Sequence, residues 1–184
     1  GLAIASYRHP LLGVQGETLA VDVARQGAAD AQALLIVSSA CHGVEGFCGS
    51  GVQVFALTVP EWLRYAKDHG VAVLYVHGLN PYGFSHGRRV THENVDLNRN
   101  FQDFSQPLPR NEAYRALHAL LLPVQWPPDA ANDAAQARFV ADHGQAALQA
   151  ALTRGQHDFA DGLFYGGRAP TWSHQTLRQI LREP

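Results

Sequence analysis

Two side chains with metal-binding chemistry, His42 and Glu45, stand three positions apart in the segment Cys41–Gly46. The apolar run before them, Ala33–Val37, has the composition of a buried strand. Zn²⁺ accepts a neutral imidazole and a carboxylate, and a catalytic zinc site holds three protein ligands and a water. One tight turn could therefore supply two ligands of a zinc ion. Taken alone, the same spacing also fits an exposed His beside a Glu that starts a helix.

Two further motifs follow in order: Asn80-Pro-Tyr-Gly83, and the segment Asn94–Phe101, which reads Asn-Val-Asp-Leu-Asn-Arg-Asn-Phe. With the His-Gly-Val-Glu-Gly motif after a strand, they resemble the zinc metallocarboxypeptidase superfamily. The resemblance is to its little-studied bacterial branch, with aspartoacylase and succinylglutamate desuccinylase as more distant relatives. It runs in motif form from about Leu34 to Phe101 and continues more weakly through Gly162–Gly167.

The resemblance implies a role for five of these residues. His42 and Glu45 match the first two zinc ligands, and Asp96 matches the carboxylate that accepts the spare N–H of the first His. Such a partner fixes the tautomer of the ring and raises its basicity as a ligand. Asn98 and Arg99 match the pair that holds the substrate carboxylate, because an Arg fork gives two parallel charge-assisted hydrogen bonds and an amide adds a third.

A catalytic Arg is also implied. Arg89 matches the residue that polarises the scissile carbonyl and stabilises its oxyanion, although the adjacent Arg88 is an alternative. In the implied mechanism zinc lowers the pKa of a water, a Glu takes its proton, and zinc and Arg89 share the oxyanion charge.

The third zinc ligand and the Glu base are not identified in the chain. The superfamily supplies the ligand from a His after a later strand, commonly as Asp-x-His, and this chain has no Asp-x-His. The downstream histidines follow no strand-like run; they are His118, His143, His157 and His174. The chain also contains no Met, not even at position 1. Together with the absent Asp-x-His, this predicts a fragment of a longer enzyme that lacks the C-terminal part. A natural truncation that keeps the fold and loses the activity is the alternative.

The elements that must position these residues alternate along the chain. Strands are predicted at Leu19–Ala24, as an edge, and at Ala33–Ser38 and Val71–Val76, both as buried strands. Strands alternating with helices predict an α/β fold with a mainly parallel, mixed sheet flanked by helices, zinc-carboxypeptidase-like but incomplete. Ligands of such sheets bind beyond the carboxyl ends of strands, where His42, Glu45 and Arg89 follow. The chain 1–184 is predicted as a single domain.

The remaining segments are predicted as helices and loops. A helix over Val52–Lys67 is interrupted by Pro60, and residues 84 to 110 form a long functional loop. Helices follow at Asn111–Leu122 and at Asp133–Thr153, where Gly144 weakens the second one. A last helix, 174 to 182, is predicted to start from a Ser173 cap.

Composition excludes several classes of function. Among 184 residues there are 14 Lys and Arg against 16 Asp and Glu, which gives no support to binding of nucleic acid or a membrane surface, since such binding usually needs a basic patch. No apolar run approaches a membrane span, and no signal peptide is visible. Two cysteines, Cys41 and Cys48, suit free thiols in a reducing compartment, so the expected location is cytoplasmic.

The sequence therefore predicts a zinc-dependent hydrolase of a C-terminal peptide or amide bond. Its substrate would be a peptide or an acyl-amino acid with a free carboxylate, and this chain by itself is expected to be inactive. A small-molecule deacylase of the aspartoacylase type is one alternative. A non-catalytic domain of the same fold that binds a carboxylate is another.

Overall fold

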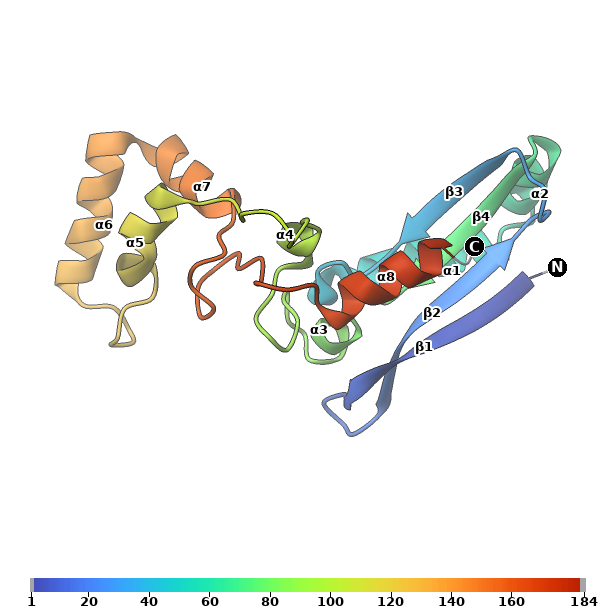
Figure 1. Ribbon diagram of the computed structural model, residues 1–184, viewed down its shortest axis with the longest axis horizontal. Helices are drawn as coiled ribbons and strands as arrows, with labels where there is room; N and C mark the ends of the chain where they lie inside the picture. Colours follow the sequence, from blue (N-terminus) through green and yellow to red (C-terminus); the bar gives the residue numbers. More distant parts are fainter. Residues whose placement is uncertain (1, 183–184) are drawn as a thin grey trace. The chain divides into compact units, whose positions relative to one another are not determined.

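The computed structural model describes residues 2 to 182 (Figure 1). Two compact units divide the chain: one comprises the residues up to His92 together with those from Thr171 on, and the other comprises Glu93–Pro170. Each unit is described by itself below. The predicted class, α/β with a mixed sheet flanked by helices, is confirmed.

The first unit contains a four-stranded sheet in the order β1-β2-β4-β3. Its strands are β1 (Leu2–Leu12), β2 (Thr18–Gln26), β3 (Ala33–Ser38) and β4 (Val71–His77). The pairs β1·β2 and β2·β4 are antiparallel, and only β3·β4 is parallel. The parallel share of the sheet is thus smaller than expected, because parallel pairing requires a crossover and only β3 and β4 are joined by one.

The positions of two strands differ from the prediction. The strand predicted as an edge, within β2, lies inside the sheet, and β3 lies at the edge with Leu34, Leu35 and Ile36 each 40–45% exposed. The prediction that Ala33–Ser38 is covered on both faces is therefore wrong for the described residues. The strand β1 was not predicted. It is an edge strand, and its register shifts in the stretch that contains Pro10, where proline is tolerated.

Helices α1 (Gly46–Thr58) and α2 (Pro60–Asp68) form the crossover between β3 and β4. The predicted single helix is split at Val59, whose backbone is extended, and Pro60 begins α2, where a missing N–H costs nothing. Both helices pack against β4, and Ala66, Val73 and Tyr75 form the buried cluster between them and the sheet.

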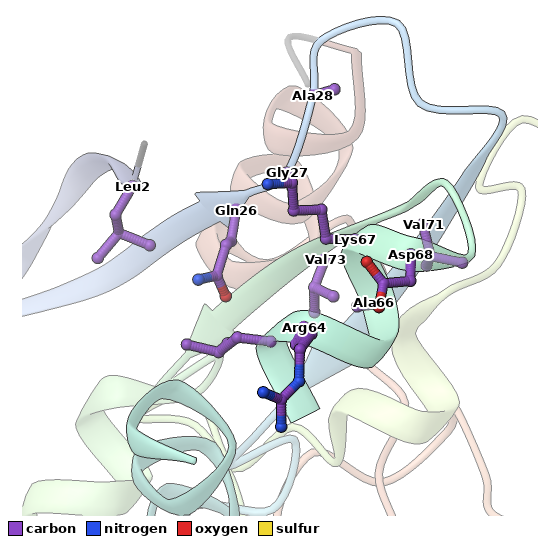
Figure 2. A pocket seen from close by; sticks show the side chains of 11 residues that line it. Leu2, Gln26, Gly27, Ala28, Arg64, Ala66, Lys67, Asp68, Val71 and Val73 are labelled. Atoms are coloured by element: carbon purple, nitrogen blue, oxygen red, sulfur yellow. The ribbon is translucent and has the colours of Figure 1, made fainter. Parts of the chain in front are cut away.

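The opposite face of the sheet is covered by α8 (Trp172–Arg182), as Figures 1 and 2 both show. The ring of Trp172 lies 4.6 Å from that of His9 on β1, edge to face. Ser173 is inside this helix rather than its cap; the Thr171 hydroxyl accepts the N–H of His174 instead. The face of the sheet that α1 and α2 cover stays partly open. A cavity of about 760 Å³ lies between α2 and the C-terminal end of β2 (Figure 2).

The second unit is helical. It contains α4 (Leu97–Asn100), α5 (Glu112–Leu121), α6 (Ala130–His143) and α7 (Gln145–Thr153). The predicted helix Asp133–Thr153 is broken at Gly144, which has a φ of 84° that favours glycine. Tyr114 and Leu117 of α5 are fully buried here. None of the helices within residues 2–182 has the length and apolarity that a membrane crossing requires.

Candidate functional site

The turn after β3 delivers His42 and Glu45 in the first unit. His42 precedes a short 3₁₀ helix, η1 (Gly43–Glu45), which leads directly into α1. Gly43 is required here, because a Cβ at this position would lie 2.0 Å from the carbonyl carbon of Gly83 in α3 (Pro81–Ser85). The backbone of the turn therefore packs directly against α3.

The side chains of His42 and Glu45 converge on one point. His42 Nδ1 lies 3.2 Å from Glu45 Oε1 and 3.1 Å from Oε2. Two ligands at about 2.0–2.1 Å from a tetrahedral zinc ion are about 3.3–3.4 Å apart, so the observed separation fits a shared metal. His42 is 8% exposed, whereas the side chain of Glu45 is 60% exposed. The pair is thus anchored on one side and open on the other.

Arg89, not Arg88, reaches this pair with its side chain. Its Nη2 lies 2.8 Å from His42 Nε2, and its Nη1 lies 3.5 Å from Glu45 Oε1. A guanidinium can only donate, so this contact makes Nε2 an acceptor and directs the proton on Nδ1 toward Glu45. Arg88 takes part through its backbone, whose carbonyl accepts the N–H of Val44.

Asn80 holds the segment that carries Arg89, and the sequence identified it only as the first residue of the motif Asn80-Pro-Tyr-Gly83. Asn80 is 1% exposed; its Oδ1 accepts the N–H of Gly83, and its Nδ2 donates to the carbonyl of Arg89. The carbonyl of Arg89 also accepts the N–H of Gly43. One buried amide thereby ties α3, Arg89 and the turn of His42 together. The polar residue directly before Pro81, at the start of a helix, was the signal that could have identified it.

The other three predicted residues belong to α4 and its cap in the second unit. Asp96 is fully buried; its Oδ1 accepts the N–H of Asn98, and its own N–H donates to the carbonyl of Tyr165. Asn98 is exposed, and Arg99 donates from Nη2 to the carbonyl of Thr153 over 2.6 Å. Arg99 Nε is buried without a hydrogen-bond partner. The fork of Arg99 therefore has a donor that the described residues leave unsatisfied.

A complete metal site is not formed by residues 2–182, which contain no group of three His, Cys, Asp or Glu side chains placed to hold an ion. The downstream histidines have local roles. His157 Nδ1 lies 2.7 Å from the carbonyl of Gly167, His174 Nε2 accepts from Arg178 Nε over 2.7 Å, and His118 stacks on Phe159. His42 and Glu45 are separated as two ligands of one zinc ion would be, and no third His, Cys, Asp or Glu among residues 2–182 joins them in such a group.

Comparisons with known proteins give one family and four matching chains among solved structures, two of which are described below. A family model described as a protein of unknown function, DUF2817, matches residues 1–184. No curated protein matches the sequence. A provisionally named carboxypeptidase from Burkholderia mallei is 19% identical with a TM-score of 0.40, over 54% of this chain and 27% of that protein. An aspartoacylase family protein from Mesorhizobium loti is 25% identical with a TM-score of 0.37, over 55% of this chain and 30% of that protein. The matched part is thus less than a third of either structure.

Proposed function

This chain belongs to the DUF2817 family, whose description names no activity. From the chain's own residues we propose that the protein is a zinc-dependent hydrolase of a C-terminal peptide or amide bond. The substrate is a peptide or an acyl-amino acid with a free carboxylate. In this proposal His42 and Glu45 are two zinc ligands, Arg89 is the catalytic Arg, and Asn98 and Arg99 bind the substrate carboxylate. Asp96 is a positioning residue.

The observation that carries the proposal is the approach of His42 Nδ1 to both carboxylate oxygens of Glu45 at 3.1–3.2 Å. The close backbone approach of Gly43 to Gly83 fixes the position of the turn that carries both residues. A zinc ion held here would lower the pKa of a bound water and polarise a carbonyl.

Arg89 supplies the charge beside that position. Its two terminal nitrogens face His42 and Glu45, and its backbone is fixed by Asn80 and Gly43. A guanidinium fixed at this place can donate to a carbonyl oxygen whose negative charge grows in the transition state. Its contribution would therefore appear in kcat rather than in binding of the ground state.

Arg99 and Asn98 suit recognition of the carboxylate. One nitrogen of the Arg99 guanidinium is anchored on the carbonyl of Thr153, which fixes the plane of the fork. The other terminal nitrogen of this guanidinium and the exposed amide of Asn98, one residue away, are donors of the kind that a carboxylate accepts. This arrangement supports selection of substrates that end in a free carboxylate.

Two alternatives keep part of this chemistry. A small-molecule deacylase would use the same ligands and Arg89 on an acyl-amino acid. A non-catalytic domain would keep carboxylate binding by Asn98 and Arg99. The incomplete set of metal ligands among residues 2–182 favours this domain over the deacylase. The two differ in whether hydrolysis occurs at all, so one experiment separates them.

The test measures zinc content and hydrolysis in the full-length protein. We expect stoichiometric zinc in the wild type and its loss in His42→Ala and in Glu45→Ala. His69→Ala, which removes an exposed His from the end of α2, is the control and keeps the zinc. Peptides with free and amidated C-termini and N-acyl amino acids are then compared as substrates. Unchanged zinc in His42→Ala would exclude the proposal, and zinc without hydrolysis of either class would leave the carboxylate-binding domain.

A further inference from the structure

A second polar cluster lies at the carboxyl end of β4 and takes no part in the proposed hydrolysis. His77 on β4 and Asp22 on β2 are directly opposite each other in the antiparallel pair. Cross-strand partners point to the same face of a sheet, here the face that α1 covers. Both residues line two adjoining cavities of the first unit, of about 450 and 480 Å³.

Gln53 on α1 sets the orientation of this cluster. It is 3% exposed, and its Nε2 donates to the carbonyls of Val37 and Val76 at 2.9 and 3.1 Å. These two acceptors fix which end of the amide is nitrogen, because an oxygen placed there would face two carbonyl oxygens. The amide oxygen of Gln53 must therefore point the other way, where it lies 3.0 Å from His77 Nδ1.

The tautomer of His77 follows from that orientation. An amide oxygen only accepts, so Nδ1 carries the proton in this contact. Ser39 Oγ, which accepts the N–H of Gly78 over 3.1 Å, lies 3.3 Å from the same Nδ1. In the neutral ring Nε2 then has a free lone pair. No hydrogen bond from another residue of the described chain reaches this atom, and His77 is among the residues that line both cavities.

The walls of the larger cavity are acidic and aromatic. Asp22 and Glu17 contribute carboxylates, and the ring of Phe84 lies edge to face with Phe47 at 4.8 Å. The hydrogen bond from Ser85 lowers the pKa of Glu17, which keeps this carboxylate ionised. Among residues 2–182, neither a Lys nor an Arg lines either cavity. His77 Nε2 and the two carboxylates are acceptors, and the charge that they favour in a ligand is positive.

The smaller cavity supplies an apolar extension. It continues from Asp22 and His77 along the sheet to Ile4, with Val54 of α1 opposite; these two side chains are 73% and 58% exposed. A cavity of this size is in the range that small ligands occupy. The combination of acceptors, aromatic rings and an apolar extension is suited to an ammonium group on an apolar body.

We propose that this pocket binds a small organic amine, whose ammonium group donates to His77 Nε2 and to the carboxylate of Asp22 while its apolar part lies against Phe47, Phe84 and Ile4. The site does not depend on the proposed hydrolase activity, since it includes neither His42 nor Glu45. Gln53 is its positioning residue, because it acts only through the tautomer of His77.

The test uses the full-length protein and phenethylamine as the probe, with phenethyl alcohol as the neutral match of the same shape. Titration calorimetry should show binding of the amine at least about tenfold tighter than of the alcohol, as expected for charge-assisted hydrogen bonds. Asp22→Asn should weaken the binding of the amine about tenfold. Asp30→Asn removes an equal charge from an exposed turn outside both cavities and should leave the affinity unchanged.

The variant His77→Asn distinguishes a loss of the Nε2 acceptor from a general loss of stability. The Asn amide keeps a donor near the position of Nδ1 for Gln53 but has no equivalent of Nε2, so amine binding should fall about tenfold while the melting temperature changes little. In ¹⁵N spectra of the wild type, the His77 ring should be protonated at Nδ1. Equal affinity for amine and alcohol, unchanged binding in Asp22→Asn, or a ring protonated at Nε2 would each overturn the proposal.

Discussion

Arg89 donates from Nη2 to His42 Nε2 over 2.8 Å, while the other ring nitrogen of His42 faces Glu45. Both ring nitrogens of His42 are thus in contact with side chains of the proposed site, Nε2 with Arg89 and Nδ1 with Glu45. If zinc binds at Nδ1, the ring proton must move to Nε2, and this atom can then no longer accept from Arg89. The guanidinium of Arg89 would then be available to donate to the carbonyl of a substrate.

The first prediction concerns Arg89. Arg89→Met removes the charge and keeps the length of the side chain, so we expect kcat for hydrolysis to fall about 10²–10³-fold, as for loss of one oxyanion donor. Zinc content should stay at the wild-type level, because the substitution leaves both proposed ligands. Arg88→Met is the matched control, since Arg88 contacts the turn through its backbone. An equal loss of kcat in both variants would contradict the assignment.

The second prediction concerns the close backbone approach of Gly43 to Gly83. Gly43→Ala places a Cβ 2.0 Å from the backbone of Gly83, so the turn or α3 must shift. We expect a destabilisation of about 1–3 kcal/mol, as for overpacking, together with loss of zinc. Gly51→Ala, within α1 and with open space around the new Cβ, should instead stabilise the protein by about 0.5–1 kcal/mol. Denaturant unfolding of both variants provides the comparison.

The third prediction separates anchoring from recognition at Arg99. Arg99→Lys keeps a charge that can reach the carbonyl of Thr153 but removes the planar fork and its Nε donor. We expect KM for substrates with a free C-terminal carboxylate to rise about tenfold with kcat nearly unchanged. Amidated substrates lack the carboxylate, so their kinetics should not respond. A drop in kcat alone, or an equal effect on amidated substrates, would show that Arg99 does not bind the carboxylate.

Local features of this chain were predictable from the sequence, and long-range pairing was not. Pro60 and Gly144 indicated helix interruptions, and both positions do interrupt helices, because their effect on the backbone is local. The apolar run Ala33–Ser38 is a strand as predicted, but its place in the sheet depends on which strands pair with it. Periodicity carries no information on that pairing, so β3 was wrongly predicted to be covered on both faces.

The same distinction holds for the candidate site. That the side chains of His42 and Glu45 lie close together could be predicted, because a tight turn brings together residues three positions apart. The choice between Arg88 and Arg89 needed the structure, since adjacent residues differ only in where the backbone directs them. The role of Asn80 could not be read from its own segment, because its amide bonds Arg89 nine positions away.

The last prediction concerns the core of the second unit and its dependence on pH. Tyr114 is fully buried and its hydroxyl oxygen accepts the N–H of Leu163 over 2.6 Å. Burial raises the pKa of Tyr114 above its ordinary value of 10.0, so the neutral phenol is favoured in the folded state. Its contribution to stability is complete below pH 10 and is lost as the pH rises through the raised pKa, because the unfolded state releases the proton first.

Tyr114→Phe should therefore have two effects. At neutral pH it should lower the free energy of unfolding by about 1 kcal/mol, because the N–H of Leu163 loses its acceptor. Above pH 10 the variant should lose stability less steeply than the wild type, since it has no phenol to titrate at this position. Urea unfolding between pH 7 and 11 measures both, with Tyr65→Phe on the surface of α2 as the control. Parallel pH profiles for the wild type and Tyr114→Phe would show that this phenol does not couple to folding.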